Sequence, residues 1–282
     1  MIAEMLAILT AFLWAIGIIY TRKGLESSDT TSGTFIRIVI GLAIFSVLTI
    51  LFVPSDSFKS EAVIYHLIAG VFGGFLGMKL GLMSIEKYGV SKSSTIISSK
   101  TLFSSFGAVL ILGEVLTIPI GVGTILIVLG VALLSLDRHD KRGWLDKRLI
   151  FPLLTAFFGG IAAIPQKIGV NITNSPILGT TIESSTALMV IVIYILLTKQ
   201  KLSLNRRSFA YFAMGGVFGG IGSLCLLYAF SIGNIVTVAP LFSISPLFTL
   251  FLAYFLLGGL EKITPKLIVS AILVVLGSAL IV

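Results

Sequence analysis

The chain carries the same stretch of sequence twice. Gly-Val-Phe-Gly-Gly at 70–74 returns unchanged at 216–220, and Val-Leu-Gly-Val-Ala-Leu at 128–133 returns as Val-Leu-Gly-Ser-Ala-Leu at 275–280. Each copy contains five apolar segments, and an odd number of membrane crossings turns the second copy upside down relative to the first. An inverted repeat of this kind is typical of secondary transporters.

The composition of the chain is that of a membrane protein. Of the 282 residues, 56% are hydrophobic and 11% are charged, and the mean hydropathy is +1.10, which the surface of a soluble domain would not tolerate. The net charge of +8 would suggest nucleic acid in a soluble protein, but the basic residues lie in short connections between apolar runs. A single cysteine, Cys225, excludes a disulfide framework and a cysteine-based metal site.

Ten segments satisfy the length requirement for a transmembrane helix, roughly 17–25 predominantly apolar residues. They cover residues 3–21, 33–53, 63–85, 91–112, 118–136, 150–169, 177–198, 208–230, 235–257 and 264–282. We therefore predict an all-α membrane protein with ten transmembrane helices arranged as two inverted five-helix repeats. The first repeat takes residues 1–136 and the second takes 149–282, with a charged linker at 137–148.

Basic residues gather on one side of the predicted bundle. The connections after the odd-numbered spans hold most of the 20 Lys and Arg residues, whereas the opposite connections hold Lys59 and Lys167. By the positive-inside rule, the odd-numbered connections, including the 137–148 linker, lie in the cytoplasm and both termini lie outside the cell. The expected location is the cytoplasmic membrane, with the lipid bilayer as the surrounding partner.

Three prolines lie where a helix does not readily accept them. Pro165 lies late in the sixth span, and Pro240 and Pro246 lie inside the ninth. Each removes a backbone hydrogen bond, so we expect these helices to bend or break there. In transporters, polar groups freed by such breaks lie at the substrate site. A kinked helix whose serines satisfy their own backbone is the alternative.

Two lysines lie at depth within predicted spans. Lys100 is in the middle of its span among serines, and we expect it to face a cavity because a lysine at the bilayer centre costs about 2.5–3.5 kcal/mol. Lys79 lies nearer the end of its span, where it either faces the cavity or extends toward the headgroups. Two unpaired cations would favour a carboxylate or a phosphate group on the substrate.

The acidic residue that lies well within a span is Glu183, and the repeat aligns it with Arg37. Inversion places the two side chains near opposite membrane faces, so we do not expect them to pair. Glu183 is a candidate gate or proton-coupling residue, with a solvated helix end as the alternative. Arg37 is a second gate candidate, although it fits an anchor at the membrane interface better.

The repeat alignment adds further substrate-site candidates. Matching Thr101 with Pro246 places Lys100 against Ser245, with Ser243 close by. Polar and aromatic residues of three other spans complete the predicted lining, namely Trp14, Gln166 and Tyr228. For Trp14, packing against lipid or protein is as good an explanation as stacking on a substrate.

A family resemblance rests on an ordered set of positions. They are the Leu-Gly-Glu step at 112–114, Glu261, the glycine-containing runs at 125–134 and 271–281, Trp14 followed by Lys23, and Arg37. In this order they resemble the EamA-type members of the drug/metabolite transporter superfamily, over essentially the whole chain. The resemblance implies export or uptake of small metabolites, often amino acids, by alternating access without ATP. It also implies that spans 3, 4, 8 and 9 form the core, that spans 1, 2, 6 and 7 move as gates and that spans 5 and 10 lie outside.

The sequence lacks the motifs of several other functions. The phosphate loop G-x-x-x-x-G-K-[ST] does not occur, and neither His66, at a span start, nor His139, in a connection, belongs to an H-E-x-x-H motif. Glu114 and Glu261 are expected to cap helix ends. We therefore expect no enzyme, no metal site and no nucleotide cofactor.

The expected function is secondary transport of a small organic metabolite, such as an amino acid or another carboxylate or anion, by a monomer or homodimer. Transport is either coupled to protons through Glu183 or passive. One alternative is a nontransporting scaffold that binds a partner through the glycine-rich third and eighth spans. Another is an organic-cation exporter, which should carry an acidic residue rather than lysines at mid-membrane.

Overall fold

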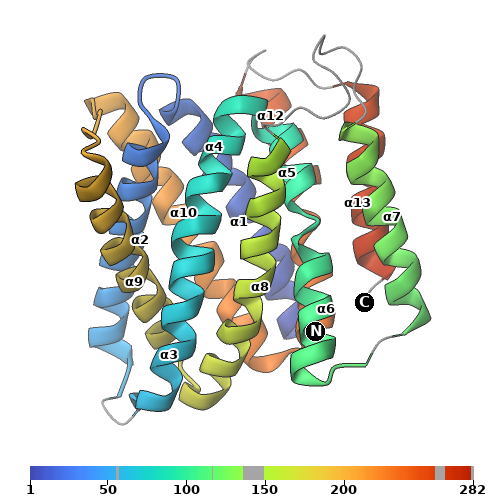
Figure 1. The fold of residues 1–282 in the computed structure, drawn as a ribbon, viewed down its shortest axis with the longest axis horizontal. Helices are drawn as coiled ribbons and strands as arrows, with labels where there is room; N and C mark the ends of the chain where they lie inside the picture. Colours follow the sequence, from blue (N-terminus) through green and yellow to red (C-terminus); the bar gives the residue numbers. More distant parts are fainter. Residues whose placement is uncertain (55–56, 116, 136–148, 258–263, 281–282) are drawn as a thin grey trace.

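The described part of the chain is a bundle of helices that run alternately up and down (Figure 1). The computed structural model describes residues 1–54, 57–115, 117–135, 149–257 and 264–280. The first copy contains α1 (Ile2–Gly24), α2 (Thr30–Phe52), α3 (Ser60–Ala69), the π-helix η2 (Gly70–Gly77), α4 (Met78–Tyr88), α5 (Val90–Ile97), α6 (Lys100–Leu112) and α7 (Ile118–Ser135). The second contains α8 (Ile150–Thr173), α9 (Pro176–Thr198), α10 (Arg206–Ile232), α11 (Ile235–Phe242), α12 (Ser245–Leu256) and α13 (Pro265–Leu280).

Several of these helices join end to end into longer columns. Within the described residues, eight columns are long and apolar enough to cross a membrane. They are α1, α2, the continuous α3–η2–α4 column, the α5–α6 column, α8, α9, α10 and the α11–α12 column. The two remaining helices, α7 and α13, pack against each other beside the other columns (Figure 1). The predicted all-α membrane fold is confirmed.

The packing of the two copies follows a pseudo-twofold arrangement. In the first copy α1 packs along α10 of the second, and α8 of the second copy packs in the same way along the α3–η2–α4 column. Helices in equivalent positions also pair across the axis, α2 with α9 and α7 with α13. Because α1 and α8 begin their copies and run in opposite directions, the repeat is inverted (Figure 1).

Helix starts are set by short polar side chains. Asp29 caps α2, where its carboxylate accepts hydrogen bonds from the backbone N–H groups of Thr31 at 2.8 Å and Ser32 at 2.9 Å. Ser175 caps the equivalent helix α9, whose first residue is Pro176. Such caps satisfy backbone donors that have no partner within the helix, and proline is tolerated in the first turn for the same reason.

Glycines allow the helices of the two copies to approach closely. A Cβ atom added to Gly17 of α1 would lie 3.1 Å from the carbonyl oxygen of Gly215 and 3.1 Å from the nitrogen of Gly219 in α10. In the equivalent interface, a Cβ atom on Gly73 would lie 3.0 Å from the Cβ atom of Ala162. Backbone-to-backbone packing of this kind replaces the hydrophobic driving force that helices lack in lipid.

The breaks in the helices differ from those predicted at the three prolines. The helix α8 continues through Pro165, and α11 continues through Pro240. The ninth span is interrupted at 243–244, and Pro246 lies in the first turn of the next helix, where its missing N–H removes no helical hydrogen bond. The fourth span carries an interruption at 98–99 that the sequence analysis did not predict.

Some sequence predictions lie outside the described residues. They concern the 137–148 linker, His139 and the helix-end role of Glu261.

Candidate functional site

A cavity of about 260 Å³ lies at the centre of the bundle. Residues of α1, α2, η2, α4, α5, α6, α8, α9, α10 and α11 line it, and its described lining includes none from α7 or α13. The volume is close to the lower end of the range for small-molecule sites, ~300–1,000 Å³. The outer position that the family resemblance implies for the fifth and tenth spans agrees with this lining.

Five of the predicted site residues line the cavity: Trp14, Arg37, Lys100, Gln166 and Glu183. Four others are not part of the lining. These are Lys79, Tyr228, Ser243 and Ser245. Tyr228 is 38% exposed on the outside of the bundle, so its prediction as a cavity residue is wrong.

Lys100 is held between two aromatic rings. Its Nζ atom lies 3.9 Å from the ring centroid of Trp14 and 4.2 Å from that of Phe242. The indole of Trp14 is itself fixed, because its Nε1–H donates a hydrogen bond to the carbonyl of Gly219 at 3.2 Å. Within the part of the chain that the structure describes, no carboxylate forms an ion pair with Lys100. The cation is therefore stabilised by aromatic faces and leaves its donors free for a ligand.

The two interrupted helices meet at their interruptions. The hydroxyls of Thr101 and Ser243 are in hydrogen-bond contact, and the Thr101 hydroxyl also donates to the carbonyl of Ala239 at 3.3 Å. The Ser243 hydroxyl lies 3.4 Å from the carbonyl of Ser98. Ser243 thus satisfies backbone groups freed by the interruptions. The structure assigns it to helix packing rather than to the cavity wall, and Ser245 is likewise buried beside it.

Lys79 ties three helices together away from the cavity. Its Nζ donates hydrogen bonds to the hydroxyls of Thr30 at 2.9 Å and Thr31 at 2.6 Å, and lies 5.5 Å from the ring centroid of Tyr194. The side chain is 7% exposed. Lys79 is therefore not part of the described cavity lining, and its partners lie at the start of α2 and near the end of α9.

Arg37, on α2, lines the cavity. Its Nε atom is buried without a hydrogen-bond partner among the described residues. A Cβ atom on Gly219 would come within 2.7 Å of its Nη2 atom, so the guanidinium packs directly against the backbone of α10. As expected, no ion pair joins Arg37 to Glu183 in the described structure.

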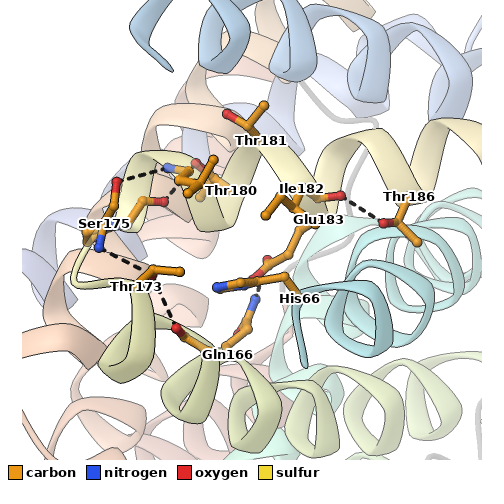
Figure 2. Close-up of polar contacts among 12 residues, drawn as sticks. His66, Gln166, Thr173, Ser175, Thr180, Thr181, Ile182, Glu183 and Thr186 are labelled. Atoms are coloured by element: carbon orange, nitrogen blue, oxygen red, sulfur yellow. Dashed lines mark hydrogen bonds and ion pairs between the residues drawn. The ribbon is translucent and has the colours of Figure 1, made fainter. Parts of the chain in front are cut away.

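Glu183 is the centre of a buried polar cluster on α9. One carboxylate oxygen lies 3.0 Å from the Nδ1 atom of His66, and the other accepts a hydrogen bond from the amide of Gln166 at 2.8 Å. Figure 2 shows the three side chains converging from α9, α3 and α8. Glu183 is 9% exposed and lines the cavity, so the alternative of a solvated helix end does not describe it.

His66 is the residue that sequence reasoning missed. Its ring has no exposed surface and lies between two glycines. A Cβ atom on Gly169 would be 2.7 Å from Nε2, and one on Gly179 would be 2.5 Å from Cε1. Nε2 is buried without a hydrogen-bond partner among the described residues. The signal that could have found it is the repeat, which places His66 at the position of Phe212.

Glu114 caps a helix of the other copy. Its carboxylate accepts hydrogen bonds from the backbone N–H groups of Ile235 at 3.2 Å and Val236 at 3.0 Å, at the start of α11. Glu114 therefore caps a helix start as predicted, but the helix is α11 of the other copy rather than the fifth span that follows it, and the contact links the end of the fourth span to the start of the ninth.

The chain is similar to known membrane proteins along its length. Residues 1–136 and 147–282 each match the EamA-like transporter family. Proteins named "Putative sugar uptake protein" from two strains of Bacillus cereus and from Bacillus anthracis are 28% identical over 287 residues, covering 99% of this chain and 95% of theirs. A solved crystal structure with 16% sequence identity superposes with a TM-score of 0.74 and covers 99% of this chain and 95% of its own, which shows the fold.

Proposed function

Because this chain belongs to the EamA-like transporter family, we propose that it carries a small polyhydroxylated metabolite of sugar size through the central cavity by alternating access. The observation that supports this is the mixed polar lining. Arg37, Lys100 and Gln166 offer donors, Glu183 offers an acceptor, and Trp14 offers an aromatic face. A neutral substrate with several hydroxyls can use both kinds of group.

The names of the relatives point in the same direction. Relatives that match nearly the whole chain carry a sugar uptake name. The cavity also contains hydroxyl side chains, including Ser104, Thr180 and Ser223, that can exchange hydrogen bonds with a sugar. These hydroxyl groups would orient the substrate without adding charge to the site, as is typical of small-molecule sites.

A carboxylate substrate, such as an amino acid, is the second candidate. Lys100 and Arg37 both line the cavity, and neither forms an ion pair with a carboxylate in the described structure. An anionic group would supply the missing partner. Glu183 on the same lining opposes an anion and is the reason that the neutral substrate ranks first.

Alternating access is supported by the inverted arrangement of the two copies. Glycine-rich surfaces of α10 and η2 let the first and sixth spans approach closely, which suits rocking of one copy against the other. The cavity lies within a single chain, so a monomer is sufficient as the transport unit. The excess of basic residues in the odd-numbered connections supports a cytoplasmic position for these connections, with both termini outside.

The test is counterflow in proteoliposomes that contain the purified chain. Vesicles loaded with unlabelled D-glucose or D-xylose should take up the labelled sugar faster than protein-free vesicles, and L-glutamate should exchange more slowly. Trp14→Ala should lower sugar exchange, whereas the matched control Tyr228→Phe, on the outside of the bundle, should not. Faster exchange of glutamate would favour the anionic substrate. No exchange of any compound would favour the scaffold, and exchange of tetraphenylphosphonium alone would favour a cation exporter.

A further inference from the structure

We infer that His66 and Glu183 form a proton-binding site that couples transport through the cavity to a proton gradient. This inference rests on the proposed transport function and assigns its driving force. It concerns a residue pair in which one member lines the cavity and the other is enclosed behind it.

The pair has the geometry of a shared proton. The Nδ1 atom of His66 and a carboxylate oxygen of Glu183 are 3.0 Å apart, and the other carboxylate oxygen is held by Gln166 at 2.8 Å (Figure 2). Imidazole changes charge closer to neutral pH than any other unperturbed side chain. Ionisable residues inside a membrane are costly and therefore mark ion and substrate pathways.

Among the other charged groups near the pair, Arg37 of α2 and Lys100 of α6 line the same cavity as Glu183 but form no ion pair with it in the described structure. On α8, the ammonium of Lys167 donates to the carbonyls of Phe230 and Gly233 at the end of α10. On α3 itself, Glu61 is exposed at the start of the helix. In η2 there is no titratable residue, and on α9 the other charged residue near the helix, Lys199, follows its far end.

Packing alone does not require a histidine at this position. The equivalent place in the other copy holds Phe212, which lies between Gly24 and Gly33 in the same way. A phenyl ring fills that space without a polar atom. His66 instead leaves Nε2 buried without a hydrogen-bond partner among the described residues, which is unfavourable for a purely structural ring.

The coupling step involves one proton and the two atoms that can share it, Nδ1 of His66 and Oε1 of Glu183. With the cavity open to one side, a proton from solution reaches Glu183, which lines the cavity, and is shared with His66 across the Oε1 to Nδ1 contact. The charge of Glu183 is then neutralised, and its second oxygen can rearrange its hydrogen bond with Gln166 as substrate occupies the cavity. After the cavity opens to the other side, the same proton leaves, and no other bond is formed or broken.

The first experiment needs no substrate. The chain has two histidines, His66 and His139, so histidine-selective ¹⁵N labelling of the full chain in nanodiscs gives two sets of NMR signals, assigned with the variant His139→Gln. The signals of His66 should change when Glu183→Gln removes the carboxylate that faces Nδ1, because the proton shared across this contact then loses its carboxylate acceptor. A His66 signal that is unaffected by Glu183→Gln would overturn the proton site.

The second experiment measures driving force. The membrane potential of the proteoliposomes is held near zero with potassium and valinomycin. A gradient of about one pH unit across the membrane should then concentrate D-glucose or D-xylose up to about tenfold if one proton accompanies each sugar. His66→Phe, which introduces the side chain that the other copy has at the equivalent position, Phe212, should abolish accumulation of the sugar. Its counterflow, which needs no net proton movement, should persist.

The outcomes separate the two proposals. Counterflow without accumulation in the unmodified chain overturns coupling and leaves the proposed function in place. Accumulation that survives in His66→Phe also overturns the site. No counterflow of any compound would overturn the proposed function and this inference together. Phe212→Leu is the matched control, because it disturbs the equivalent slot without removing a titratable group, and accumulation should survive in it.

Discussion

Two rings occupy equivalent positions in the two copies and differ in chemistry. Phe212 of α10 lies between Gly24 and Gly33, where a Cβ atom on either glycine would lie 2.5 Å or 2.8 Å from the phenyl ring. His66 of α3 lies in the same way between the glycines of α8 and α9. The repeat matches the two glycine pairs, so each copy has the same space for a ring between two glycines, called here the ring slot. The ring slot holds an apolar phenylalanine in one copy and a titratable histidine in the other.

The cavity residues of the two copies diverge in the same manner. Arg37 and Glu183 occupy equivalent places on α2 and α9, and both line the cavity with opposite charge. Lys100, on the cavity, has Ser245 as its counterpart, which is buried away from it. The shared backbone therefore sets the position of the site, whereas substrate and coupling chemistry depend on residues in which the copies differ.

The largest effect should come from adding a side chain at Gly70, where a helix of one copy meets the backbone of the other. A Cβ atom on Gly70 would lie 2.6 Å from the backbone oxygen of Glu183, whereas one on its counterpart Gly216 would lie 3.1 Å from the backbone oxygen of Arg37. Backbone cannot move aside as a side chain can. Gly70→Ala should therefore lower the free energy of unfolding by about 3 kcal/mol, at the upper end of overpacking costs, and Gly216→Ala by less. Denaturant unfolding of the two variants in detergent would measure the difference, and equal losses would show that the two interfaces are energetically alike.

The second prediction concerns substitutions that add a methyl group beside each of the two rings, His66 and Phe212. Gly179→Ala and Gly33→Ala should each destabilise the chain by about 2 kcal/mol, because the new methyl group meets His66 or Phe212 respectively. Only Gly179→Ala should also reduce proton-driven accumulation of sugar, because it displaces His66 from Glu183. Thermal unfolding and accumulation would be measured on both variants. A similar loss of accumulation in Gly33→Ala would mean that slot packing, rather than protonation, controls transport.

The third prediction compares Lys100 with its counterpart Ser245. Lys100→Met keeps the length of the side chain and removes the charge held between Trp14 and Phe242. Sugar counterflow should fall on the order of tenfold, which corresponds to about 1.4 kcal/mol. Ser245→Ala, outside the cavity lining, should leave counterflow within about twofold of the unmodified chain, since it makes no contact with the substrate. Equal effects would remove Lys100 from the binding site.

Much of the fold could be predicted from the sequence because the bilayer imposes it. Apolar length gives the helical columns, and the repeat gives their inversion. Polar residues predicted within spans also include Lys100, Gln166 and Glu183, which line the cavity, since a polar group at depth needs a cavity or a partner. These predictions depend on properties of single segments in a known solvent.

What the sequence did not predict depends on contacts between segments. The interruption at 98–99 contains no proline that would have predicted it, and it is stabilised by a hydrogen bond from Ser243 of the other copy. Pro165 leaves α8 continuous, although proline removes a backbone hydrogen bond in the interior of a helix. The sequence places His66 at a span start, but glycines of α8 and α9 lie against its ring, and only the alignment with Phe212 marks the position as a buried ring. Lys79 found its partners in the threonines of α2 rather than in the cavity.

The smallest predicted effect concerns the caps of the equivalent helices α2 and α9. Burial alone would raise the pKa of Asp29, but hydrogen bonds from the side chain and backbone of Ser32 and the backbone of Thr31 outweigh it, so the pKa lies below its ordinary value. A lowered pKa in the folded state adds stability above the ordinary pKa of aspartate, and this stability is lost as pH falls through the lowered value, below about pH 4. Asp29→Ala and Ser175→Ala should each cost about 1 kcal/mol at neutral pH, and only the first should flatten the acid dependence of unfolding. Thermal unfolding between about pH 3 and pH 7 would measure both. An acid dependence that is unchanged in Asp29→Ala would show that the Asp29 carboxylate does not contribute to it.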